Sequence, residues 1–205
     1  MKEISKLEYI DKKKVKVYLD GQYFGFLYQG EVKRYYLKEG KFLDDNILNE
    51  IEEEIMLKRA KERALYILQK MDKTEYEISN KLRQNYYSDA IISRVVNFLK
   101  EYHYIDDYRY ASTFFQYKEK NKSIRQIKEA LYQKGISNDI INNILESYVS
   151  KETAAIQTLA AKKMRGRILS QMDRESVQKL VGYLVGKGFR YEDIKHVISN
   201  AELEE

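Results

Sequence analysis

HYIDDYRYA, residues 103–111, is the stretch that decides the fold of this chain. A segment with apolar residues at helical spacing ends just before it, and another begins inside it. Either Asp106 or Asp107 can accept hydrogen bonds from the free backbone N–H groups of the new helix, and the carboxylates suit the positive end of its dipole. Ala111, Phe114 and Phe115 then continue an apolar stripe. The stretch predicts a helix–turn–helix joint with a strong N-cap.

The segments on either side of this joint repeat with an offset of 49 residues, the distance from Thr74 to Ser123. Both residues open a predicted capping box, in which Glu77 or Gln126 would return the hydrogen bond. Ser88 and Ser137, which can cap the next helix, follow at the same offset. Five apolar pairs also share it: Ile78 and Ile127, Leu82 and Leu131, Ile91 and Ile140, Ile92 and Ile141, Val95 and Ile144. Caps and core positions that agree in one offset predict two copies of a three-helix repeat.

The predicted helices of the first repeat are 64–71, 75–84 and 89–101, and those of the second are 107–120, 124–133 and 138–147. A less regular third copy contains Leu180 and Leu184, and its Lys187-Gly188-Phe189 matches Lys134-Gly135-Ile136. Glycine at that position can close a helix in the left-handed conformation. The connection 163–171 is longer than its counterparts, and no serine precedes the final helix.

The N-terminal part differs from the repeats. Residues 4–10 alternate weakly, and Val15, Val17 and Leu19 alternate clearly before Asp20-Gly21, which favours a tight hairpin turn. Residues 23–28 would return as the partner strand, with a bulge at Gly25. A short helix over 31–38 and a longer one capped by Asp44 are expected to follow.

The predicted fold is therefore mainly α: tandem three-helix repeats in an elongated array, preceded by a small β-hairpin or meander with helices. The predicted domains are 1–63, 64–107, 108–151 and 152–205, the last with an acidic tail. Three short helices bury only a small core, so stacked neighbours are expected to share apolar surface.

Composition excludes several classes of protein. The 205 residues carry a formal net charge of +5 and include no cysteine, which excludes disulfides and thiolate catalysis. No apolar run approaches the ~20 residues of a membrane span, and the charged N-terminus lacks a signal peptide's apolar core. A cytoplasmic protein is expected. The 19 tyrosines fall mostly at apolar helix positions, which favours packing at the edge of the core over a stacking surface for bases.

The sequence predicts no catalytic, cofactor or metal site. The only histidines, His103 and His196, have no second base or nucleophile at useful spacing. Residues 182–188 resemble a phosphate loop, but the spacing is one residue short and no strand precedes it. The acidic pairs at 44–45 and 106–107 stand where N-caps belong.

Basic residues are unevenly distributed. Residues 64–107 contain 6 basic and 7 acidic residues, residues 108–151 contain 8 and 4, and residues 152–201 contain 9 and 5. The excess lies mainly near the connection between the first two helices of the second and third repeats. The candidate partner-binding residues are Lys118, Lys120, Lys122, Arg125, Lys128, Lys162, Lys163, Arg165, Arg167, Lys187 and Arg190. A surface that serves only solubility is the alternative.

The joint resembles a motif of the RecX family of bacterial regulators of the RecA recombinase, which reads Gly-Tyr-Leu-Asp-Asp-x-Arg-Phe-Ala. The matching residues are Tyr104, Ile105, Asp106, Asp107, Arg109, Tyr110 and Ala111, and His103 replaces the family glycine. Lys134-Gly135-Ile136 and the hairpin at Leu19-Asp20-Gly21 also match, so the resemblance covers nearly the whole chain. If the glycine serves a turn with positive φ, His103 must tolerate that conformation or the turn must differ.

The resemblance implies a non-enzymatic modulator that binds the RecA–single-stranded-DNA filament, lies in its groove across neighbouring protomers, and depresses ATP hydrolysis and strand exchange. We expect the basic residues of the second and third repeats to face the filament, direct DNA binding to be weak, and the protein to be a monomer without a cofactor. Two alternatives are a helix-turn-helix DNA-binding protein, which would bind naked DNA tightly with base preference, and a helical scaffold for another protein.

Overall fold

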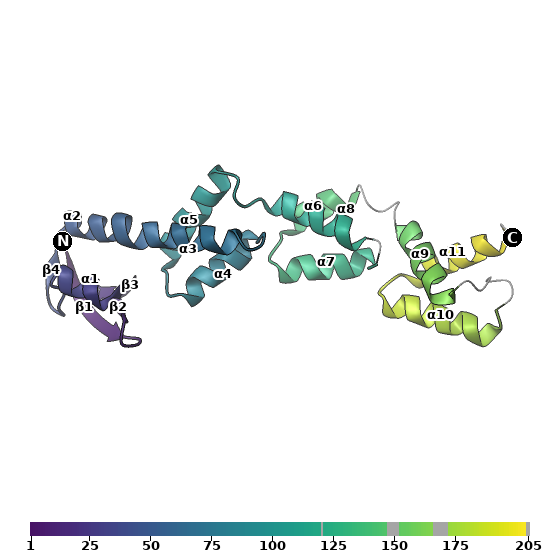
Figure 1. The fold of residues 1–205 in the computed structure, drawn as a ribbon, viewed down its shortest axis with the longest axis horizontal. Helices are drawn as coiled ribbons and strands as arrows, with labels where there is room; N and C mark the ends of the chain where they lie inside the picture. Colours follow the sequence, from purple (N-terminus) through teal and green to yellow (C-terminus); the bar gives the residue numbers. More distant parts are fainter. Residues whose placement is uncertain (120, 147–151, 166–171, 204–205) are drawn as a thin grey trace. The chain divides into compact units, whose positions relative to one another are not determined.

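A computed structural model describes residues 1–119, 121–146, 152–165 and 172–203 of the chain (Figure 1). The chain divides into two compact units, Met1–Asp106 and Asp107–Glu205. Unit 1 holds a small sheet and the first three-helix repeat. Unit 2 holds the second and third repeats.

The sheet in unit 1 has four antiparallel strands in the order β3-β2-β1-β4. Strand β1 spans Lys2–Tyr9, β2 Lys14–Leu19, β3 Gln22–Tyr28 and β4 Phe42–Leu43. The hairpin between β2 and β3 turns at Asp20 and Gly21, whose φ angles of 48° and 79° are both positive, as the predicted turn requires. The register shifts beside Gly25, which confirms the bulge. Strand β4 was not predicted, since two residues are too short to show alternation.

The helices that follow the sheet differ from the prediction. Helix α1 spans Gln29–Arg34, which begins and ends earlier than expected. Asp44 caps helix α2, Asp45–Glu50, by accepting a hydrogen bond of 2.9 Å from the Ile47 amide. Helix α2 continues through the π-helix η1, Ile51–Leu57, into α3, Lys58–Leu68, with helical backbone angles at both junctions.

The sequence left open whether the helix that begins after Asp44 continues into the predicted helix over 64–71; in the structure it does, and it ends at Leu68. Residues 45–68 form one uninterrupted helix because no glycine or proline stands between Asp44 and Leu68. The π-helical hydrogen bonding changes the period within it, so the side chains buried on either side of η1 do not follow one 3.6-residue pattern.

The first repeat shares its core with the sheet. It combines α3 with α4, Glu75–Gln84, and α5, Asp89–Glu101. Ile78, Leu82 and Leu99 belong to the same buried cluster as Ile4 and Leu27 of the sheet. The Thr74 capping box is confirmed, with bonds of 3.1 Å from the Glu77 amide and 3.3 Å to the Glu77 carboxylate.

The second and third repeats each have a core of their own. Helices α6, α7 and α8 span Asp107–Lys118, Ile124–Gln133 and Asn138–Glu146, and α9, α10 and α11 span Glu152–Met164, Arg174–Gly186 and Tyr191–Leu203. Among the described residues, Phe115, Ile127 and Leu131 centre one cluster and Ile156 and Leu184 centre another. The tandem three-helix architecture is thus confirmed. Among the described buried residues, the first repeat shares one cluster with the sheet, whereas the second and third repeats have one cluster each.

The Ser123 cap differs from a full capping box. The Ser123 hydroxyl accepts a hydrogen bond of 3.3 Å from the Gln126 amide, but between these two described residues no reciprocal bond from the Gln126 side chain forms. A Cβ placed on Gly188 would lie 3.1 Å from the Gln126 Cγ, so this side chain is turned toward the third repeat. Ser88 precedes α5 as its N-cap without a side-chain bond.

The second helix of each repeat ends in the same left-handed cap. Tyr86, Gly135 and Gly188 have φ angles of 66°, 77° and 87°. The next residue in each case, Tyr87, Ile136 or Phe189, is buried, and its amide bonds a carbonyl of the last helical turn at 3.1–3.3 Å. The glycine caps are as predicted. The first repeat achieves the same geometry with tyrosine.

Candidate functional site

The residues of the 103–111 motif mainly support the fold. His103 has a φ of 55° and closes α5, and the Tyr104 amide bonds the Leu99 carbonyl at 2.8 Å. His103 therefore adopts the conformation for which the family glycine is suited. Ile105 is buried in the core of unit 1, and Ala111 is buried in the core of the second repeat.

The other motif residues lie at the start of α6 and around its first turns. Asp106 immediately precedes the helix and Asp107 begins it. Tyr110 stacks on Phe114 with ring centroids 6.3 Å apart, and the Lys134 ammonium lies 5.3 Å from the Tyr110 ring. With Gly135 as the left-handed cap of α7, this set holds the second repeat together.

The basic residues of the second repeat surround the connection between α6 and α7. Lys118 ends α6 with its ammonium 4.7 Å from the Tyr117 ring. Lys122 precedes the cap of α7, and Arg125 and Lys128 follow at helical spacing that places them on one face. Lys120 lies outside the described residues.

The corresponding residues of the third repeat cluster at the end of α9. Lys162 and Lys163 stand in its last turn, and Arg165 follows with a φ of 52°. Lys187 caps α10, and Arg190 forms an ion pair of 3.3 Å with Glu192. Arg167 lies outside the described residues.

The structure brings the start of α7 close to the turn between α10 and α11. A Cβ placed on Gly188 would lie 2.7 Å from the Ser123 hydroxyl oxygen. Lys122 is the chain neighbour of Ser123, and Lys187 is the chain neighbour of Gly188. Each of these lysines is therefore next in the chain to a residue at the meeting point of the two repeats, which their separation in the sequence did not show.

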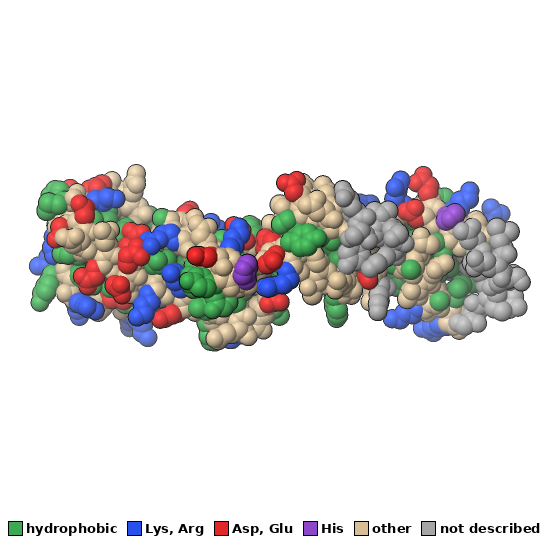
Figure 2. Space-filling model, turned by 90° about the horizontal axis from the view of Figure 1, so that it is seen from above, with side chains coloured by type: hydrophobic (Ala, Val, Ile, Leu, Met, Phe, Trp, Pro, Cys, Tyr) green, Lys and Arg blue, Asp and Glu red, His purple; other side chains and the backbone are tan. Residues whose placement is uncertain are grey.

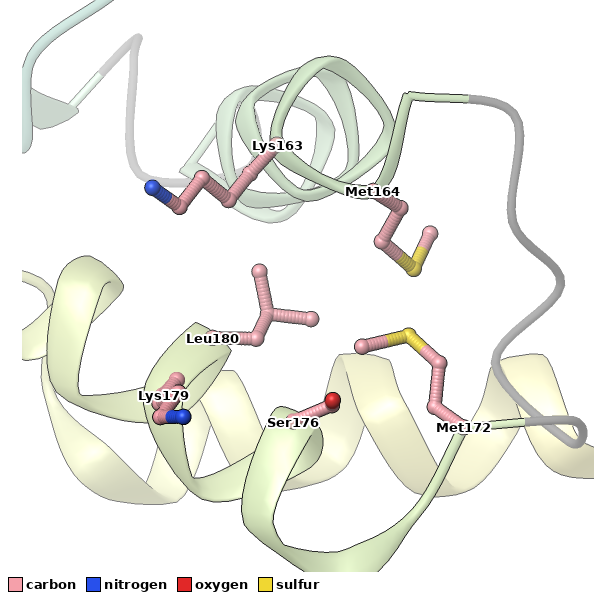
Figure 3. A pocket seen from close by; sticks show the side chains of 6 residues that line it. All are labelled: Lys163, Met164, Met172, Ser176, Lys179 and Leu180. Atoms are coloured by element: carbon pink, nitrogen blue, oxygen red, sulfur yellow. The ribbon is translucent and has the colours of Figure 1, made fainter.

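A pocket of about 440 Å³ opens at the end of α9 and is lined by Lys162, Lys163, Met164, Arg165 and Tyr183. An adjoining pocket of about 170 Å³ shares Lys163 and Met164. Figure 3 shows Met164 and Met172 pointing toward each other across the adjoining pocket, with Leu180 between the helices and Lys163 and Lys179 on one side. Sequence reasoning missed Tyr183, because its position in α10 reads as ordinary helix packing.

The basic residues of the repeats differ in their pairing. Four of the six basic residues in 64–107 form ion pairs: Lys73, Arg83, Arg94 and Lys100. Figure 2 shows basic and acidic side chains adjoining over unit 1. In the second and third repeats, the described candidates without a carboxylate of the described residues within 4.0 Å are Lys118, Lys122, Arg125, Lys128, Lys162, Lys163, Arg165 and Lys187.

The acidic residue Asp173 caps a helix of the third repeat. Asp173 accepts a hydrogen bond of 2.7 Å from the Ser176 amide at the start of α10, and this bond holds the pKa of Asp173 below its usual value.

Within the described residues, no group of three or more side chains that could hold a metal ion occurs. Of the described helices, none is both long and apolar enough to cross a membrane.

Comparison with known proteins gives the family. Three models match the chain: the RecX first three-helix domain at residues 60–99, the second at 106–145 and the third at 151–198. "Regulatory protein RecX" of Clostridium acetobutylicum is 34% identical, covering 95% of this chain and 94% of that protein. The chain belongs to the RecX family.

Other RecX proteins agree over similar lengths. "Regulatory protein RecX" of Clostridium tetani is 32% identical over 92% of this chain and 88% of the relative. A crystal structure titled as regulatory protein RecX has a TM-score of 0.62 and 26% identity, covering 96% of this chain and 98% of that one. The RecX structure from Lactobacillus salivarius has a TM-score of 0.64 and 27% identity, covering 72% and 97%. As a RecX family member, the protein is regulatory and not an enzyme.

Proposed function

We propose that this protein binds the RecA–single-stranded-DNA filament and inhibits its ATP hydrolysis and strand exchange through the basic surface of its second and third repeats. Membership of the RecX family supports RecA as the partner. The observation that carries the choice of surface is that eight of the candidate basic side chains in these repeats have no carboxylate partner among the described residues.

Unpartnered cations suit a polyanionic or acidic target for a physical reason. A basic side chain already paired with a carboxylate gains little from a second anion, because the two attractions compete. The four ion-paired residues of the first repeat are in that position, whereas Lys122, Arg125 and Lys128 are not. The charge of these candidates in the second and third repeats is therefore available to the filament.

Repetition supports a polymeric target. Two repeats, each with an unpartnered basic cluster, can contact neighbouring protomers of one filament at the same time. The second contact then forms at high effective concentration, so modest individual contacts sum to useful avidity. A single recognition helix reading one DNA site would not need the charge to recur.

The test is ATP turnover by RecA on single-stranded DNA with Lys122→Glu/Arg125→Glu. Each change turns an attraction into a repulsion, and the concentration for half-inhibition should rise about tenfold. The matched control is Lys70→Glu/Lys81→Glu, which changes the net charge equally at exposed positions of the first repeat. Its inhibition should stay within about twofold of the wild type.

A gel shift on bare DNA, run alongside, separates the alternatives. Inhibition at concentrations that barely shift DNA supports the proposal. A strong shift that depends on base sequence, without inhibition of RecA, would favour a helix-turn-helix DNA-binding protein instead. Equal loss of inhibition in both double variants would refute the chosen surface.

A further inference from the structure

The pocket at the end of α9 combines one aromatic ring with an unusual density of positive charge. The Lys163 ammonium lies 5.1 Å from the centroid of the Tyr183 ring, and the Lys187 ammonium lies 5.5 Å from it. Lys162 and Arg165 line the same pocket. Two helices and the turn after α10 thus direct four cations to the surroundings of one ring.

No described carboxylate neutralises this cluster. Lys162, Lys163, Arg165 and Lys187 have no ion pair with any described acidic side chain, whereas Lys179 and Arg190 of the same repeat pair with Glu175 and Glu192. Three of these like charges line the cavity and the fourth, Lys187, lies beside its aromatic ring. They repel each other, so an anion that enters the cavity lowers the electrostatic energy. The contrast with the paired residues nearby indicates a site for an anionic ligand.

The size and the lining of the pocket narrow the class of ligand. Its volume of about 440 Å³ lies within the range of ~300–1,000 Å³ typical of small-ligand pockets, and it exceeds what a phosphate group alone would fill. Tyr183 is half-buried, so one part of the ring is accessible and the other packs on the core. An accessible aromatic ring beside several cations is the arrangement with which proteins hold unpaired bases and their phosphates.

We propose that this pocket binds one nucleotide of single-stranded DNA, with the base stacked on Tyr183 and the flanking phosphates on Lys162, Lys163 and Arg165. The ammonium groups now beside the ring move to the phosphates as the base takes their place. A duplex cannot occupy the pocket in this way, because its bases are paired and stacked on each other. The third repeat then contacts the DNA itself and not only the protein that coats it.

This inference deepens the proposed function and rests on it for its setting, the DNA within or beside a RecA filament. Direct contact with the strand gives the third repeat an anchor that persists where protomers are missing from the filament. The anchor requires no base preference, because every base presents a π-face.

The test measures binding of the full-length protein to a fluorescein-labelled 20-nucleotide oligothymidylate by anisotropy. Tyr183→Ala should weaken binding about tenfold, and Tyr183→Phe should stay within about twofold of the wild type, because the ring is kept. Lys162→Gln/Lys163→Gln should also weaken binding and reduce the slope of log affinity against log salt by about 1.4, for two lost phosphate contacts on a single strand. An unlabelled duplex should compete poorly.

Arg174→Gln/Lys195→Gln is the matched control, because it removes the same charge from exposed positions that do not line the pocket. Equal weakening by both charge pairs, efficient competition by the duplex, or unchanged binding of Tyr183→Ala would each overturn the inference. Thermal unfolding followed by circular dichroism identifies any variant that fails to fold. If Tyr183→Ala fails to fold, Lys162→Gln/Lys163→Gln still decides the test, because both lysines are exposed and their replacement does not disturb the core.

The RecA ATPase assay on the same variants distinguishes the two proposals. If the wild type inhibits RecA but Tyr183→Ala binds DNA normally, the pocket inference fails and the proposed function stands. If the oligonucleotide result holds but the wild type leaves RecA unaffected, the proposed function fails and the nucleotide site stands.

Discussion

Gly188→Ala tests how the second and third repeats meet. Gly188 has a φ of 87°, and Gly135 occupies the equivalent cap of the second repeat with a φ of 77°. An alanine in the left-handed region costs ~1–2 kcal/mol, so Gly135→Ala should destabilise its repeat by that amount. Gly188→Ala carries the same cost and adds a Cβ that would lie 2.7 Å from the Ser123 hydroxyl oxygen.

The additional cost follows from the role of that hydroxyl. Ser123 is fully buried and accepts the 3.3 Å bond that caps α7, so the oxygen cannot move away without weakening the cap. Loss of a serine cap costs about 1 kcal/mol, which brings the total for Gly188→Ala to ~2–3 kcal/mol. The extra loss should appear in α7, in the neighbouring repeat, and not only in α10.

Native-state hydrogen exchange measures these effects repeat by repeat. This is needed because the second and third repeats each have a core of their own, so the chain need not unfold in one step. In the Ser123→Gly background the clash with oxygen is absent, and only the flexible Gln126 side chain remains close. Gly188→Ala should then cost no more than Gly135→Ala. If Gly188→Ala and Gly135→Ala cost the same in the wild-type background, with α7 amides unaffected, the packing of Gly188 on Ser123 is refuted.

Three further outcomes are expected. His103→Gly should stabilise α5 by ~0.5–1 kcal/mol in urea unfolding, because glycine accepts a φ of 55° without strain; destabilisation would mean that the imidazole makes contacts worth more than this strain. Thr74→Ala should lower the opening free energy of α4, measured by exchange of its amides, by ~1–2 kcal/mol, since the buried hydroxyl caps the helix. Thr74→Ser keeps the hydroxyl and should largely retain that stability. The lowered pKa of Asp173 contributes stability that is fully present above its unfolded value of 3.8 and is lost as the pH falls through the folded value. The protection of α10 amides, relative to their intrinsic exchange rates at each pH, should therefore fall as the pH drops below the unfolded value of 3.8. An equal fall in Asp173→Asn, which caps without titrating, would contradict this origin.

Local signals accounted for the repeat architecture. Thr74, Ser123 and Asp44 cap helices as their side chains predict, because a cap involves atoms only three residues apart in the chain. The hairpin at Asp20-Gly21 is equally local. The joint at residues 103–111 closes one helix and opens the next as its residues predict, even with His103 in the place that suits glycine.

Features that depend on distant residues were missed. Tyr86 adopts the left-handed cap that glycine fills in the other repeats, and the Tyr23 hydroxyl of the sheet donates to the Tyr86 carbonyl there. Tyr87 packs on Phe26 with ring centroids 5.2 Å apart. These contacts join the sheet to the first repeat, and Tyr23 and Tyr86 are 63 residues apart in the chain. No periodicity in the sequence could indicate a contact over that separation.

The sequence by itself determined where most helices begin and end, that they form three related repeats, and which of those repeats carry excess positive charge, because these properties depend on neighbours along the chain. The tertiary structure decided which basic side chains remain unpaired, how the cores are divided between repeats, and that Tyr183 stands among lysines from two helices. Such properties arise from residues brought together in space by packing, where burial and the competition between ion-pair partners replace spacing as the determining factors.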